Sequence, residues 1–83
     1  MKVTVKLFAT LTDYLPADSR RNQVEVEVAE SDRVESLLES FHLPKRLVHL
    51  VLINGVYVPP AERSSRRLVA DDHLAVWPPI AGG

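Results

Sequence analysis

The stretch that decides the fold is QVEVEVAESDRVESLLESF, residues 23–41, because its hydrophobic period changes halfway along. The first part alternates as a β-strand with one buried face does, with valines facing inward and Glu25 and Glu27 facing outward. The second part repeats apolar side chains at the i, i+3, i+4 and i+7 spacing of an amphipathic helix. The residues of that stripe are Val34, Leu37, Leu38 and Phe41. A strand that leads directly into a helix predicts the α+β class.

Polar residues around the stripe indicate where the helix begins and ends. Asp32 is a favourable N-cap residue, and Glu35 three positions later completes a capping-box pattern. Pro44 disfavours a helical backbone for the residue before it. We therefore expect the helix to end at or before Leu43.

Apolar runs on both sides of residues 23–41 predict the other strands. Residues 1–11, MKVTVKLFATL, alternate and form a hairpin with residues 23–29, although Phe8 lies on the otherwise polar face. Residues 47–53, LVHLVLI, are almost continuously apolar, which favours a central strand buried on both faces or nearly so.

The second half of the chain supplies a second hairpin and a last strand. Asn54-Gly55 is a strong signal for a tight turn, because both residues tolerate positive φ, and residues 56–58 then form a short return strand. Residues 73–77, HLAVW, alternate again, with Ala75 and Trp77 facing outward.

The resulting order, ββ-α-ββ-β, predicts a mixed sheet of about five strands packed on one helix. If the first and last strands are parallel neighbours, Phe8 lies beside Trp77 on the face that the helix does not cover. Two outward aromatic rings on neighbouring strands indicate a binding surface. The alternative is that a loop folds over them.

Length and composition exclude several functions. The chain has 83 residues, which is one domain, and a core of that size leaves little room for a deep substrate pocket. Its net charge of −1 argues against nucleic-acid binding, and it has no cysteine for a disulfide or a thiolate site. Its His residues lack metal-site spacing, and no window is apolar enough to span a membrane. We expect a cytoplasmic protein with no metal and no membrane partner.

Two small basic clusters fall in predicted loops. They are Arg20-Arg21 and the group Arg63, Arg66 and Arg67. We interpret both clusters as solvated loops, and a docking patch for an acidic partner is the alternative.

The end of the chain, PPIAGG, is an arm with no bulky or charged side chain beyond Ile80. We divide the chain into a domain of residues 1–79 and a flexible tail of residues 80–83. Two prolines stiffen the root of the arm, and two of the chain's three glycines free its tip. In this interpretation the working group is the terminal carboxylate, which a separate enzyme must first join to AMP. A sulfur donor then gives a thiocarboxylate, and an amine gives an amide.

The element order, VLINGVYV at residues 51–58 and above all LAVWPPIAGG at residues 74–83 resemble the MoaD/ThiS sulfur-carrier family. Nearly the whole chain resembles the molybdopterin synthase small subunit, which has a ubiquitin-like β-grasp fold. The resemblance implies that an adenylating enzyme related to ubiquitin E1 uses ATP to activate Gly83, which then becomes a thiocarboxylate.

The resemblance also implies a protein that is not an enzyme, binds no cofactor and delivers sulfur in a partner's active site. That partner is the molybdopterin synthase large subunit or another sulfur-accepting enzyme. Phe8 and Trp77 match apolar positions that contact partners in the family. The inserted arm consists of Pro78, Pro79, Ile80, Ala81 and Gly82.

Three alternatives stay open. The chain could be a ubiquitin-like modifier that forms isopeptide bonds to lysines, a sulfur carrier for thiamine, a tungsten cofactor or another pathway, or a binding domain with an inert tail.

One departure from the family is Asp71-Asp72, where a Gly-Asp turn is usual. Because Asp tolerates the left-handed region, we expect this turn to form.

Overall fold

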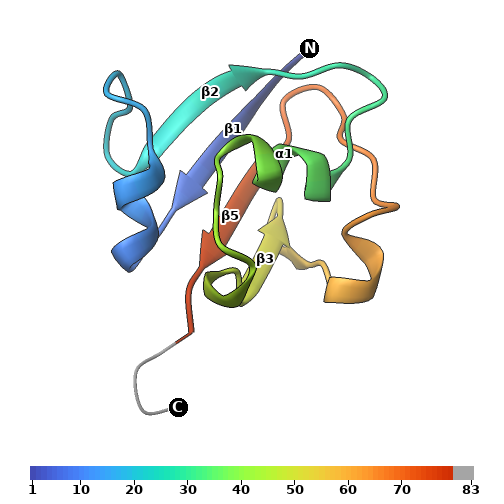
Figure 1. The fold of residues 1–83 in the computed structure, drawn as a ribbon. Helices are drawn as coiled ribbons and strands as arrows, with labels where there is room; N and C mark the ends of the chain where they lie inside the picture. The colour runs from blue at the N-terminus through green and yellow to red at the C-terminus, as the bar shows by residue number, and fades with distance from the viewer. Residues whose placement is uncertain (80–83) are drawn as a thin grey trace.

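The chain folds as a five-stranded mixed sheet with one α-helix across it (Figure 1). The structure is a computed structural model that describes residues 1–79. The strands are β1 (Lys2–Leu7), β2 (Gln23–Glu27), β3 (Leu50–Ile53), β4 (Val56–Tyr57) and β5 (His73–Trp77). The helical elements are α1 (Val34–Ser40) and the 3-10 helices η1 (Ala9–Tyr14), η2 (Lys45–Leu47) and η3 (Pro60–Glu62). The predicted order ββ-α-ββ-β is confirmed.

β1 and β5 pair in parallel at the middle of the sheet, whose strand order is β2-β1-β5-β3-β4. This placement confirms that the first and last strands are neighbours. The strand predicted within residues 47–53 is confirmed as β3, which pairs with β5 on one side and β4 on the other, but it begins only at Leu50. Its residues alternate between buried and half-buried. The run is almost continuously apolar because the uncovered face of β3 is also apolar.

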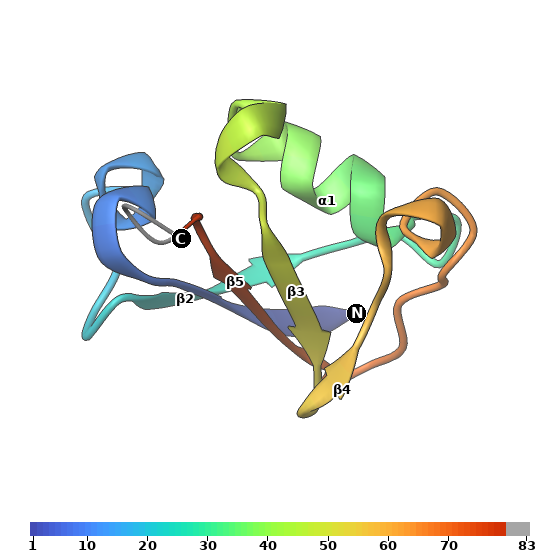
Figure 2. The ribbon, with the colours of Figure 1, turned by 90° about the horizontal axis from the view of Figure 1, so that it is seen from below.

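The core lies between the sheet and α1. α1 and the 3-10 helices gather over one face of the sheet and leave the other face bare (Figure 2). Burial of each aliphatic side chain contributes about 1.5–3 kcal/mol relative to exposure. The almost fully buried side chains that the sheet contributes are Val3, Val5, Leu7, Val51, Ile53, Leu74 and Val76. The helix contributes Val34, Leu37 and Leu38, as its apolar stripe predicts.

The start of α1 differs from the prediction. The N-cap residue is Arg33, which has extended backbone angles and donates its backbone N–H to Ser36 Oγ at 2.8 Å. Asp32 instead accepts a 2.9 Å hydrogen bond from the backbone N–H of Ala29, so its carboxylate closes a turn before the helix. The predicted end is confirmed, because α1 stops at Ser40.

The second hairpin has the predicted turn, with φ of 51° at Asn54 and 84° at Gly55. The Asn54 side chain also holds the turn before β5. Its amide nitrogen donates to Asp72 Oδ1 at 2.9 Å, and its oxygen accepts from the backbone N–H of His73 at 2.9 Å. Asp72 is buried and also accepts from the backbone N–H of Val69 at 2.9 Å. The carboxylate therefore has protein partners on both oxygens.

The turn at Asp71-Asp72 forms without the glycine that is usual in the resembled family. Asp71 has a φ of 69° and donates its backbone N–H to the carbonyl oxygen of Lys2 at 2.8 Å. The expectation that this turn tolerates aspartate is confirmed.

Replacing Asn54 by alanine should lower the free energy of unfolding by about 2–3 kcal/mol. The change leaves an oxygen of the buried Asp72 carboxylate without its hydrogen-bond donor. It also places alanine at a positive φ, which asparagine tolerates better because its side chain can form local hydrogen bonds. Urea denaturation measures the loss. Ser64→Ala, at an exposed position, is the matched control and should change stability by less than about 0.5 kcal/mol. A loss as small as that of the control would contradict the role given to Asn54.

Candidate functional site

Phe8 and Trp77 stack on the face of the sheet that no helix of residues 1–79 covers. Their ring centroids are 4.2 Å apart and their planes differ by 4°, which confirms that the two side chains are neighbours. The backbone N–H of Phe8 donates to the carbonyl oxygen of Val76 at 3.1 Å, so the parallel pairing of β1 and β5 sets the position of both rings. Both side chains are half-buried, so part of each ring remains open to a partner.

The stack belongs to a larger apolar surface across the bare face. In the register of the sheet, Leu50 pairs with Trp77, and Leu52 pairs with both Ala75 and Tyr57. Directly paired residues point to the same side of a sheet, so these side chains share the face of the stack. We call this surface the open-face band, and its residues are Phe8, Leu50, Leu52, Tyr57, Ala75 and Trp77.

Sequence reasoning missed Leu50, Leu52 and Tyr57. It assigned the run at residues 47–53 to a strand buried on both faces, which left none of its side chains for binding. Tyr57 is 52% exposed, and Leu50 and Leu52 are half-buried. The register of β3 against β5 and β4 puts Leu50, Leu52 and Tyr57 on the same face as Trp77. This register cannot be read from a single sequence.

The root of the arm leaves the sheet at one end of the open-face band. The carbonyl oxygen of Trp77 accepts a 3.0 Å hydrogen bond from the backbone N–H of His49. Pro78 and Pro79 have no N–H to continue the pairing, so the β-ladder ends there. Pro78 is half-buried and Pro79 is exposed. The other predicted arm residues, Ile80, Ala81, Gly82 and Gly83, lie outside the described residues, and their roles stay predictions.

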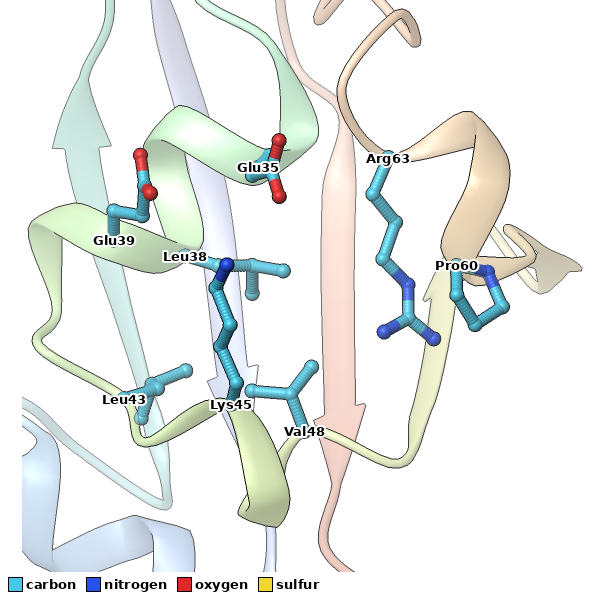
Figure 3. A pocket seen from close by; sticks show the side chains of 8 residues that line it. All are labelled: Glu35, Leu38, Glu39, Leu43, Lys45, Val48, Pro60 and Arg63. Atoms are coloured by element: carbon cyan, nitrogen blue, oxygen red, sulfur yellow. The ribbon is translucent and has the colours of Figure 1, made fainter.

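A pocket of 360 Å³ lies on the helix side of the sheet, between α1, residues 43–48 and η3 (Figure 3). Its walls are partly apolar and carry two carboxylates and two cations, so their charges favour neither an anion nor a cation. It contains none of the predicted site residues, and we do not assign it as the functional site. The lining residues are Glu35, Leu38, Glu39, Leu43, Lys45, Val48, Pro60 and Arg63.

Residues 1–79 contain neither a cluster of metal ligands nor a helix that could span a membrane. No three His, Asp or Glu side chains of this part of the chain gather closely enough to hold a metal ion. No helix within it is both long and apolar enough to cross a lipid bilayer.

The architecture defines the class of protein. A mixed five-stranded sheet that packs around one main helix is the ubiquitin-like β-grasp fold. The sequence then defines the family, because the profile of the Mut7-C ubiquitin family matches residues 1–81, and the chain belongs to that family. Together with the solved structures below, this match confirms the expected membership of the MoaD/ThiS-type ubiquitin-like proteins. A comparison with curated proteins finds no match.

Three solved structures are similar over almost the whole chain. SAMP1, a small archaeal modifier protein from Haloferax volcanii, shares 27% identity over 100% of both chains, with a TM-score of 0.68. The putative molybdopterin converting factor subunit 1 from Pyrococcus furiosus shares 24% identity over 95% of this chain and 98% of that chain, with a TM-score of 0.67. A chain of the complex of subunits 1 and 2 of molybdopterin-converting factor from Helicobacter pylori 26695 shares 17% identity over 100% of both chains, with a TM-score of 0.61. The last two similarities show the shared fold.

Proposed function

We propose that this protein is a sulfur carrier that works through the carboxyl group of Gly83. The observation that carries the proposal is the Phe8–Trp77 stack, whose ring centroids are 4.2 Å apart. The stack lies at the root of an arm whose last two residues are glycines. The open-face band offers a partner enzyme a docking surface beside that root. The body of the protein is then held while the arm, from Pro78 to Gly82, enters the partner's active site.

The proposed chemistry needs no catalytic side chain of this chain. The Gly83 carboxylate attacks the α-phosphate of ATP in an adenylating enzyme related to ubiquitin E1, which releases pyrophosphate and leaves an acyl adenylate. A hydrosulfide-level donor then attacks the acyl carbon, AMP leaves, and a thiocarboxylate forms. The activation is required because a carboxylate with its full negative charge is a poor acyl donor. Because the proposed activation uses ATP, we expect these steps to take place in the cytoplasm.

We assign the acceptor to molybdopterin synthesis. The similarity to subunit 1 of molybdopterin-converting factor supports this assignment, as does the Pro-Pro pair before the tail. The partner that takes the sulfur would then be the molybdopterin synthase large subunit, and the open-face band would contact it. In this proposal the protein is a co-substrate and its partners perform the catalysis. The acceptor in thiamine synthesis is tested in the binding experiment below, and a carrier for a tungsten cofactor or another pathway stays an alternative.

The first step is tested with purified proteins. Full-length protein, the adenylating enzyme and ATP should support exchange of labelled pyrophosphate into ATP. Exchange that does not depend on the protein would contradict the proposal. Binding titrations with the large subunit and with a thiazole-forming enzyme then identify the acceptor, and we expect the large subunit to bind at least about tenfold more tightly.

A second function, as a ubiquitin-like modifier, is favoured by the similarity to SAMP1 at 27% identity. It shares the adenylation step but transfers the acyl group to a lysine amine, with release of AMP or a thiol. Immunoblots of cells that express the protein distinguish the two functions. A modifier gives higher-mass conjugates that disappear when Gly82 and Gly83 are deleted, and a carrier gives none.

A further inference from the structure

Arg63 is buried, which corrects the interpretation of its cluster as a solvated loop. The residue is 9% exposed, whereas Arg66 and Arg67 in the same segment are exposed. A guanidinium is always charged at neutral pH, and its burial is unfavourable unless hydrogen bonds compensate for the lost water. The contacts of this side chain therefore indicate what it does.

The guanidinium joins the two open ends of the β3–β4 hairpin. Its Nε donates to the carbonyl oxygen of Val58 at 3.3 Å, just after β4, and an Nη donates to the carbonyl oxygen of His49 at 3.2 Å, just before β3. Figure 3 shows the side chain extending from its backbone toward β3 and β5. The planar group can hold two carbonyls from different segments in a fixed geometry, which a more flexible ammonium cannot do.

His49 connects this contact to the root of the arm. Its carbonyl oxygen accepts from Arg63, and its backbone N–H donates to the carbonyl oxygen of Trp77 at 3.0 Å. The two residues after Trp77 are prolines, so they donate no backbone hydrogen bond to the sheet. Among residues 1–79, the bond from His49, just before β3, to Trp77 is the last backbone hydrogen bond on this side of β5 before the arm begins.

We propose that Arg63 is a positioning residue that fixes, through His49, the direction in which the arm leaves the sheet. The functional reason for this role rests on the proposed function, because a carrier must hold its terminal carboxyl group at a fixed position relative to the docked body. Its structural part, the coupling of Arg63 to the root of the arm, is independent of what the arm does.

Amide hydrogen exchange of Arg63→Met tests the coupling, because methionine keeps an unbranched apolar stem and removes the donors. We expect the exchange of the His49 amide to become at least about tenfold faster, while the amides between β1 and β2 change by less than about threefold. The emission of Trp77, the chain's single tryptophan, should shift as well. Arg66→Met, at the neighbouring exposed position, should change none of these signals.

Equal acceleration at His49 and in the β1–β2 amides would show only a general loss of stability and would overturn the proposal, as would no change at His49. Arg63→Lys serves as the second variant if methionine prevents folding. Lysine can donate to one carbonyl oxygen at a time, so we expect partial protection of the His49 amide, between wild type and methionine. Full wild-type protection with lysine would contradict the need for the guanidinium's geometry.

The adenylation assay gives a separate readout. Because no side chain of the open-face band is substituted, Arg63→Lys should keep its KM within about threefold and lose at least about tenfold in kcat. An effect confined to KM would contradict a positioning role. If the wild-type protein is not adenylated at all, the proposed function fails, and the exchange measurement still decides the coupling of Arg63 to the arm.

Discussion

Deletion of Gly83 should abolish adenylation, with a fall in kcat/KM for pyrophosphate exchange of at least about 1,000-fold. The deletion withdraws the terminal carboxyl group by one residue, about 3.3–3.6 Å of extended chain. Misplacement of a reacting group by only about 1 Å can lower a rate by about 100-fold. The docking surface remains, so the dissociation constant for the partner should stay within about threefold of the wild-type value.

Ala81→Gly is the matched control for this deletion, because it alters the arm but keeps its length. We expect its exchange activity to remain within about fivefold of wild type, since glycine adds flexibility to an arm that the partner's channel orders. Exchange by the truncated protein at a rate close to that of this control would show that the position of the carboxyl group does not matter.

The second large effect is expected for Trp77→Ala, which should weaken binding to the partner enzyme by about 2 kcal/mol or more, roughly 30-fold. Trp77 lies in the open-face band between Phe8 and Leu50 and is half-buried in the free protein. An aromatic side chain at the centre of a docking surface contributes far more than the surrounding contacts. Isothermal titration calorimetry with the adenylating enzyme or the large subunit measures the change.

Val56→Ala controls for general loss of exposed apolar surface. Val56 is 61% exposed, and it pairs with Ile53, which faces the helix side of the sheet. It therefore lies outside the open-face band, and its replacement should change the binding free energy by less than about 0.5 kcal/mol. Trp77→Ala also loses the stack, worth about 0.5–1.5 kcal/mol of stability, so both variants must be confirmed folded by urea denaturation. Equal binding by the two variants would exclude the open-face band as the docking surface.

Features set by local pattern were predictable from the sequence. The alternation of β1 and β5 gives the faces of Phe8 and Trp77, and the rings are neighbours because β1 and β5 pair in parallel, which the sequence analysis assumed as a condition. Asn54-Gly55 was predictable because few residue pairs tolerate two positive φ values in succession.

Features set by tertiary contact were not predictable in this way. Asp32 has the chemistry of an N-cap, but its carboxylate satisfies the N–H of Ala29 before the helix begins. Arg63 resembles its exposed neighbours in sequence and is distinguished only by the carbonyl groups of His49 and Val58, which the fold brings to it. In both cases the competing partner is a backbone group whose position depends on the fold.

The intact mass of the protein shows whether Gly83 becomes a thiocarboxylate. The protein is expressed together with its adenylating enzyme and a sulfur donor, purified and measured by mass spectrometry. We expect a mass increase equal to the replacement of one oxygen by sulfur, located on the C-terminal fragment and lost when Gly83 is deleted. A protein that supports pyrophosphate exchange but keeps its unmodified mass would contradict the account.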